Sequence, residues 1–160
     1  MMLNLDTAQQ VQIDNRHDPT QSLIGGARYL KMLKDELPPR ILEPDRTWLA
    51  LAAYNIGIGH LNDARELTRT RGGNPNAWMD VKKSLPLLRK KAWYSRTHCG
   101  YARGDEAVDY VENIRLYYDQ LVWAVDYGTS PPSVTLTASR ADTPEVLSGA
   151  VPANRGNPLE

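Results

Sequence analysis

The chain has few of the features that mark a disulfide-bonded, cofactor-binding or membrane-spanning protein. It contains a single cysteine, Cys99, so it can form no internal disulfide and no cysteine-rich metal site. Its 160 residues carry 19 basic and 19 acidic side chains, and this balance gives no overall field that would favour nucleic acid or anionic lipid. No apolar run is long enough to cross a bilayer, and the first residues lack the basic and apolar segments of an export signal. We therefore expect one globular domain with no cofactor and no nucleic-acid partner.

Histidines and aromatic residues are the remaining candidates for special chemistry. His17, His60 and His98 lack the spacing of a metal-binding motif, so we expect ordinary histidines and no bound metal. The chain has no phenylalanine, whereas it has 8 tyrosines and 4 tryptophans. These rings bury an apolar body and keep a polar group for a hydrogen bond, which suits a core and also suits stacking on sugars. For any single ring, core packing is the more frequent role.

Residues 18–56 predict two helices. Asp18 followed by Pro19 is typical of an N-cap and a first helical position, and the apolar spacing predicts a helix to about Leu37. Asp45 can cap a second helix, whose residues 48–54 are apolar on every side, so this helix is expected to lie among others. The stripe expected to be buried on the first helix comprises Leu23, Ala27, Leu30, Leu33 and Leu37.

Three more helices and one loop are predicted up to residue 127. The helices are expected over residues 61–70, 76–85 and 105–127, and an ordered loop of the kind that often lines clefts over residues 87–104. The last helix is the longest and is expected to close the core along its apolar stripe. This stripe comprises Val108, Val111, Ile114, Tyr118, Leu121 and Val125.

The composition changes after Gly128. Residues 128–160 are rich in serine, threonine, proline, alanine and glycine, and such a segment buries too little apolar area to offset the entropy lost on ordering. We expect a disordered tail over residues 128–160 and a folded domain over residues 1–127. No segment predicts a strand and no internal repeat is present, so the expected fold class is mainly α.

Two polar groups of residues have an ordinary structural explanation on spacing alone. Asn55 lies just before Gly57 at the end of the central helix, where both residue types are common because they tolerate the left-handed conformation. Tyr110, Asn113 and Tyr117 share one face of the last helix, where a polar face is usually solvated. Spacing alone therefore favours structural roles for these residues.

Several motifs nevertheless occur in an order that resembles one enzyme family. The chain contains Gly25-Gly26-Ala27-Arg28-Tyr29-Leu30, then the run from Ala52 through Tyr54-Asn55 to Gly59, then Gly100-Tyr101-Ala102-Arg103-Gly104, and then Tyr110-Val111-Glu112-Asn113-Ile114. Together these segments resemble the lytic transglycosylases of the SLT type, which cleave bacterial peptidoglycan on a lysozyme-like helical fold. The resemblance covers about residues 1–125.

The resemblance implies a reaction, a partner and a set of site residues. The family acts on peptidoglycan glycan strands with one catalytic glutamate, which protonates the glycosidic oxygen and helps the sugar close a 1,6-anhydro ring. By analogy, Tyr54 and Asn55 line sugar subsites, Tyr110 lies near the catalytic carboxyl with Asn113 on the same face, and Met1 and Met2 belong to the cleft floor. The family also implies a periplasmic, outer-membrane-associated location and a regulatory module resembling solute-binding proteins upstream.

The chain departs from the family at its catalytic residue. The Glu-Ser motif that carries the acid is absent, and Met2 stands where many relatives have glutamine, so the acid is expected upstream of Met1 and this chain alone is predicted to be inactive. Glu112 is an unsuitable substitute because neighbouring helix positions point about 100° apart, which turns it away from Tyr110 and Asn113. We expect Glu112 to pair with Arg115 or a neighbouring helix.

Two alternatives to the enzyme remain open at this point. One is a non-catalytic module that binds peptidoglycan in the same cleft. The other is a purely structural helical fragment in which Tyr54, Asn55 and Tyr110 serve the core and the helix ends.

Overall fold

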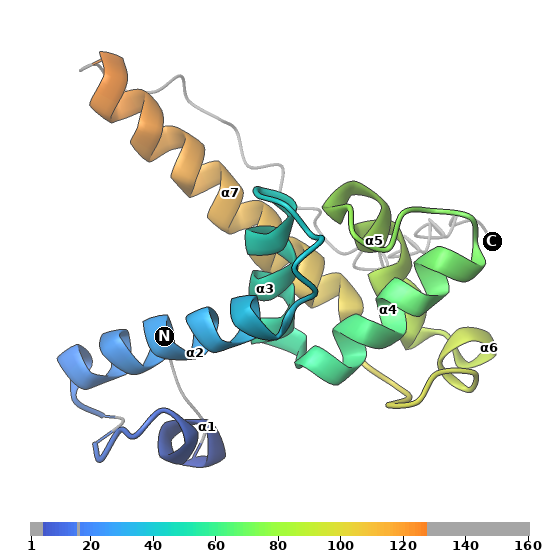
Figure 1. Ribbon diagram of the computed structural model, residues 1–160, viewed down its shortest axis with the longest axis horizontal. Helices are drawn as coiled ribbons and strands as arrows, with labels where there is room; N and C mark the ends of the chain where they lie inside the picture. The colour runs from blue at the N-terminus through green and yellow to red at the C-terminus, as the bar shows by residue number, and fades with distance from the viewer. Residues whose placement is uncertain (1–4, 16, 128–160) are drawn as a thin grey trace, which may run out of the picture. The chain divides into compact units, whose positions relative to one another are not determined.

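The computed structural model describes residues 5–15 and 17–127, which form helices joined by turns and loops. No strand occurs within these two ranges, as the sequence predicts. The order along the chain (Figure 1) is α1 (Leu5–Gln10), α2 (Pro19–Glu36), α3 (Asp45–Ile56), α4 (Ile58–Thr70), α5 (Trp78–Ser84), the 3₁₀ helix η1 (Leu85–Arg89), α6 (Lys91–Tyr94) and α7 (Gly104–Tyr127).

Helix α3 is the centre of the packing, and the prediction of an enclosed helix is confirmed. Leu49, Ala50, Ala52 and Ala53 are completely buried because α2, α4, α5 and α7 all contact this helix (Figure 1). The small alanine side chains let these neighbours approach closely, since interiors are packed to the density of organic crystals.

Helix α2 begins as the sequence predicts but buries a different face in its first half. The Asp18 carboxylate accepts a hydrogen bond from the backbone N–H of Gln21 at 2.7 Å, which is a side-chain N-cap. The predicted stripe is correct for Leu33 and Leu37, which are buried, but it is wrong for Leu23, which is 63% exposed, and for Ala27, which is exposed as well. Gly25 and Gly26 are the buried residues of the early turns. Periodicity finds an apolar stripe, but it does not tell which neighbour covers each turn.

Asp45 has a different role from the predicted cap. It is the first residue of α3, and its carboxylate accepts a hydrogen bond from the backbone N–H of Trp78 at 2.8 Å. Pro44 occupies the N-cap position without a side-chain hydrogen bond. Asp45 therefore joins the start of α3 to the start of α5, a contact that no local sequence pattern can show.

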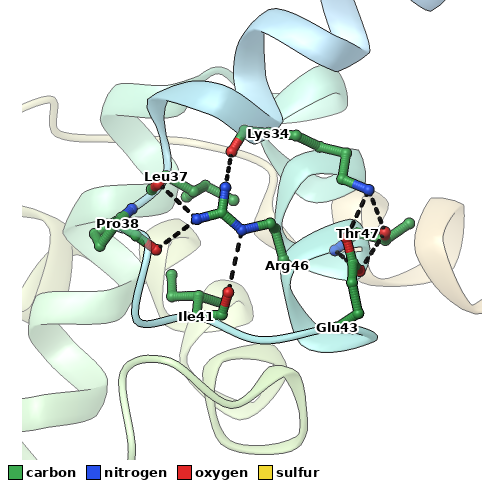
Figure 2. Close-up of polar contacts among 7 residues, drawn as sticks. All are labelled: Lys34, Leu37, Pro38, Ile41, Glu43, Arg46 and Thr47. Carbon is green, nitrogen blue, oxygen red and sulfur yellow. Dashed lines mark hydrogen bonds and ion pairs between the residues drawn. The ribbon is translucent and has the colours of Figure 1, made fainter.

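The junction between α2 and α3 is held by one arginine (Figure 2). The Arg46 guanidinium donates to the backbone carbonyls of Lys34, Leu37, Pro38 and Ile41. The last carbonyls of a helix have no partner within the helix, so a guanidinium fork placed there satisfies several acceptors together. Arg46 fixes both the end of α2 and the turn that leads into α3.

The segment from α4 to α6 is more regular than the sequence suggests. Helix α4 begins at Ile58 rather than Leu61. The interruption between α3 and α4 is a single residue, Gly57, whose φ of 91° is outside the helical range. The predicted loop over residues 87–104 contains part of η1 and all of α6, and only its later part is irregular. Short turns of this kind lack the repeated period by which longer helices are found.

Helix α7 closes the core with its first part only. Val111 is completely buried, and Val108 and Ile114 pack against the same cluster. The predicted stripe is wrong beyond this point, because Leu121 is 65% exposed and Val125 is 83% exposed. Tyr118 is exposed as well. The regular spacing of apolar residues thus continues along α7 beyond Ile114, although the later residues of the stripe do not pack against this cluster.

Some predictions fall on residues outside the described ranges. The disordered tail over residues 128–160 and the placement of Met1 and Met2 at a cleft floor both belong to this group. Within the described ranges, no helix combines the length and the apolar character needed to span a membrane.

Candidate functional site

Tyr54 lies near the end of α3 with its ring packed between two groups of buried residues. Its ring centroid is 5.3 Å from that of Tyr29, at an angle of 60°. The Tyr54 hydroxyl is buried and has no hydrogen-bond partner among the described residues. Burial raises the pKa of Tyr54, and the nearby Tyr110 and Tyr29 raise this pKa further. Tyr54 thus presents an unused hydroxyl in a poorly solvated place.

Tyr110 reaches the same region from α7. Its side chain is partly buried against the main core, and this burial raises the pKa of Tyr110. Helix α7 contacts α3, and both tyrosines pack against the same core. Tyr54 and Tyr110, which are far apart in the sequence, therefore lie on two helices in contact and pack against one core.

Asn55, which follows Tyr54 in the chain, borders a surface pocket of about 290 Å³. Its side chain is exposed and makes no hydrogen bond within the described part of the chain. Asn55 lies within α3, one residue before its end. Its φ is not positive, since Gln12 is the one non-glycine residue with positive φ in the described ranges. Gly57 ends the helix instead, so the left-handed role offered by spacing alone does not explain Asn55. The pocket is lined by Asn55, Ile56, His60, Tyr101, Ala102, Arg103 and Glu106.

The other side of this pocket comes from the loop before α7 and from the first turn of that helix. Arg103 pairs with Glu106 at 3.0 Å. Glu106 precedes Tyr110 by four residues, so the two side chains share a face of α7. Asn113, Tyr54 and Tyr110 are not part of the lining. Sequence reasoning missed Arg103 and Glu106, although their three-residue spacing at a helix start is a visible signal.

Comparison with known proteins gives this geometry a family. Residues 1–76 match the family described as Transglycosylase SLT domain. A protein of Alteromonas mediterranea is 59% identical over 128 residues, which is 80% of this chain and 28% of the relative. The chain belongs to the SLT transglycosylases. A Saccharophagus degradans relative is 61% identical over 123 residues, 77% of the chain and 25% of the relative. A Pseudomonas syringae pv. tomato relative is 50% identical over 162 residues, 95% of the chain and 33% of the relative.

All three relatives carry the name membrane-bound lytic murein transglycosylase F. The chain spans between a quarter and a third of the length of these curated relatives. The family match and these alignments agree with the lysozyme-like helical fold expected from the motifs.

In this SLT domain Glu112 is a structural ion-pair residue. Its Oε1 accepts from the Trp78 indole N–H at 2.9 Å and lies 3.4 Å from Lys82 Nζ and 3.3 Å from an Arg115 nitrogen. The Arg115 guanidinium also lies 5.2 Å from the centre of the Trp48 ring. The expected pairing with Arg115 and a neighbouring helix is confirmed.

The surroundings of Glu112 also decide its charge. Burial raises the pKa of Glu112, but the Trp78 hydrogen bond and the charges of Lys82 and Arg115 outweigh burial and lower this pKa below 4.5. A general acid must hold its proton near neutral pH. Glu112 is ionised there, so it is not suited to protonate a leaving group.

Glu112→Gln is expected to lower the free energy of unfolding at neutral pH by about 1 kcal/mol, because the amide keeps an acceptor for Trp78 but loses the attraction to the two cations. The folded pKa is lowered, so the stability due to this charge is present above the ordinary value of 4.5 and is lost as the pH falls through the folded pKa. Urea denaturation of both proteins at neutral pH and in acid measures this difference. A gap that stays constant or widens in acid contradicts the assigned ion pair.

Proposed function

We propose that this chain supplies the glycan-binding part of a peptidoglycan lytic transglycosylase domain. The family reaction is the non-hydrolytic cleavage of the bond between N-acetylmuramic acid and N-acetylglucosamine, with formation of a 1,6-anhydro ring. The observation that carries the proposal is that Tyr54 and Tyr110 are partly buried against one core and that Asn55, next to Tyr54 in the chain, lines a pocket, in a chain that resembles the SLT family over residues 1–76.

The tyrosine pair suits the environment of a catalytic carboxyl. A carboxyl that is removed from water keeps its proton to higher pH, because burial disfavours its charged form. The buried Tyr54 hydroxyl has no partner in the described ranges and is free to donate to a carboxylate or a sugar oxygen placed against it. The wall formed by Tyr54 and Tyr110 therefore fits beside an acid that works near neutral pH.

The proposed acid is the family glutamate, and its place in the domain precedes Met1. Of the carboxylates near the tyrosine pair, Glu112 is committed to Trp78, Lys82 and Arg115. Glu106 borders the pocket, but its side chain is 56% exposed and pairs with Arg103. Glu106 is too exposed to keep a proton near neutral pH, and the cations beside Glu112 outweigh its partial burial and favour its charged form. A non-catalytic glycan-binding module is the second candidate function, because the pocket and the tyrosines are independent of the acid.

The pocket walls explain how a sugar chain is held. Asn55 offers an amide with donors and an acceptor, Arg103 and Glu106 offer charged groups, and Tyr101 offers an exposed aromatic face. Sugar rings combine hydroxyl groups with apolar faces, so a polar rim beside an aromatic ring matches their chemistry. We assign the partner as peptidoglycan glycan strands. The relatives' names support a periplasmic, membrane-associated setting, with a regulatory module upstream as a further part of the proposal.

The test is a titration of the folded chain with muropeptides or chitooligosaccharides, followed by NMR. Asn55→Ala is expected to weaken binding by about 1–3 kcal/mol, because a sugar group loses its hydrogen-bond partner in the pocket. Asn62→Ala is the matched control, since Asn62 is an exposed asparagine on α4 whose described contact is with Arg65. Equal affinity of the wild-type chain and Asn55→Ala would return Asn55 to a purely structural role.

A further inference from the structure

Three side chains that commonly bind metal ions meet at the start of α4. His60 and Asp63 lie on this helix, and Cys99 lies in the loop before α7. One potential ligand atom from each of the three residues lies within 4.8 Å of the others. His60 also lines the Asn55 pocket, whereas Asp63 and Cys99 do not. The cluster therefore shares His60 with the proposed glycan site, and its other two residues lie outside the pocket lining.

The buried Asp63 carboxylate holds this loop in place. One of its oxygens accepts from the backbone N–H of His98 at 3.0 Å, and the other accepts from the backbone N–H of Cys99 at 2.8 Å. These bonds set the position of the Cys99 thiol relative to α4. Each carboxylate oxygen keeps a further lone pair, because an ionised carboxylate accepts at about four sites. Asp63 can thus anchor the loop and still act as a ligand.

His60 provides a second observation at the cluster. Its Nδ1 is buried and has no hydrogen-bond partner among the described residues. Buried polar atoms in native proteins almost always have a partner, so an unused nitrogen in an imidazole ring that neighbours a carboxylate and a thiol needs an explanation. A bound cation would give the imidazole a role there, because neutral imidazole is the commonest metal ligand in proteins.

We propose that His60, Asp63 and Cys99 form a binding site for a divalent ion of the zinc type. A nitrogen, oxygen and sulfur ligand set favours such an ion over calcium or magnesium, which prefer oxygen ligands. Metal–ligand bonds of about 2.0–2.3 Å place tetrahedral ligand atoms roughly 3–4 Å apart, so small side-chain rotations suffice to close the site. On binding, the thiol gives its proton to solvent. Water or His98, whose Nδ1 is 3.8 Å from the Cys99 sulfur, completes the coordination.

This ion would have a structural role in the pocket. It would tie α4 to the loop that carries Tyr101 and Arg103, both of which line the pocket beside Asn55. The sequence alone predicts no metal site, because no local spacing of its histidines and its cysteine resembles a complete site. The structure joins a one-turn pair, His60 and Asp63, to a cysteine 36 residues beyond Asp63.

Cobalt(II) titration of the purified 160-residue chain tests the proposal directly, because a cysteine ligand gives a thiolate-to-cobalt charge-transfer band in the near ultraviolet. We expect this band in the wild-type chain, its loss in Cys99→Ser, and its displacement by zinc. His60→Ala is expected to weaken metal binding by about 10–100-fold. His17→Ala, which changes an exposed histidine outside the cluster, should bind like the wild type. Absence of the band in the wild-type chain, or unchanged affinity in His60→Ala, would overturn the proposal.

A second readout does not depend on how well the Cys99→Ser variant folds. Cys99 is the chain's one cysteine, so its alkylation by iodoacetamide is followed unambiguously by mass spectrometry. Zinc is expected to slow this reaction at least tenfold in the wild-type chain, and a chelator should restore the rate. Magnesium should have no effect. Equal alkylation rates with and without zinc, or full zinc protection in His60→Ala, would contradict the three-residue site.

Discussion

Arg46→Met is expected to lower the free energy of unfolding by about 3–5 kcal/mol, because four backbone carbonyls lose a hydrogen bond together and only the Pro38 carbonyl keeps another donor, the Ile41 N–H. The acceptors belong to Lys34, Leu37, Pro38 and Ile41, and Figure 2 shows the guanidinium directed into this turn. A loss of this size is a large part of the net stability of a small domain, which is about 5–15 kcal/mol. Thermal and urea denaturation followed by circular dichroism measure the change.

Two variants separate this role from the loss of a positive charge. Arg69→Met removes an exposed arginine on α4 whose side chain pairs with Glu66, and it should change stability by no more than about 0.5 kcal/mol. Arg46→Lys keeps the charge but not the planar fork, so it should recover only part of the loss. If Arg46→Met proves as mild as Arg69→Met, the guanidinium does not hold the joint between α2 and α3.

Gly104→Ala is expected to cost about 3 kcal/mol or more, because the first residue of α7 lies directly against the backbone of η1. A β-carbon at Gly104 would lie 1.9 Å from the carbonyl oxygen of Leu85 and 2.3 Å from its carbonyl carbon. Both are backbone atoms of a completely buried residue, so the clash is relieved only by moving α7 away from η1. Denaturation melts report the stability.

Gly100→Ala is the matched control for this clash. Gly100 has a φ of 81° but nothing within 4 Å of an added β-carbon, so its cost is that of the left-handed backbone alone, about 1–2 kcal/mol. Both glycines belong to the segment Gly100-Tyr101-Ala102-Arg103-Gly104. A Gly104→Ala variant no less stable than Gly100→Ala would show that the close approach of α7 and η1 is unimportant.

Sequence periodicity predicts the long helices well, since a helix with one buried face repeats its apolar residues at steps of three and four. The starts of α2 and α7 fall within a residue of their predicted positions, and the enclosed α3 is evident from its all-round apolar composition. The pattern does not tell which neighbour covers a stripe. For this reason the exposure of Leu23 and Val125 was not predicted. Asp45 was misassigned for a related reason, because its partner, Trp78, comes from a distant helix.

Site residues that belong to a sequence motif could be predicted, whereas site residues that only the folding of distant segments brings together could not. Tyr54 and Tyr110 belong to ordered motifs, and both pack against the same core. The exact lining of the pocket depends on how the loop before α7 folds back to Asn55, which no local rule describes. The meeting of His60 with Cys99 depends on the same loop. Long-range contacts of this kind follow from packing rather than from propensity.

Product analysis of purified peptidoglycan tests the central claim most directly. The claim is that this chain contributes the glycan-binding wall of the domain and that none of its carboxylates near that wall is the proton donor. The folded 160-residue chain is therefore predicted to release no 1,6-anhydro-muropeptides detectable by mass spectrometry. Release of these products by the wild-type chain, abolished in Glu112→Gln or Glu106→Gln, would contradict the account and identify that glutamate as the acid.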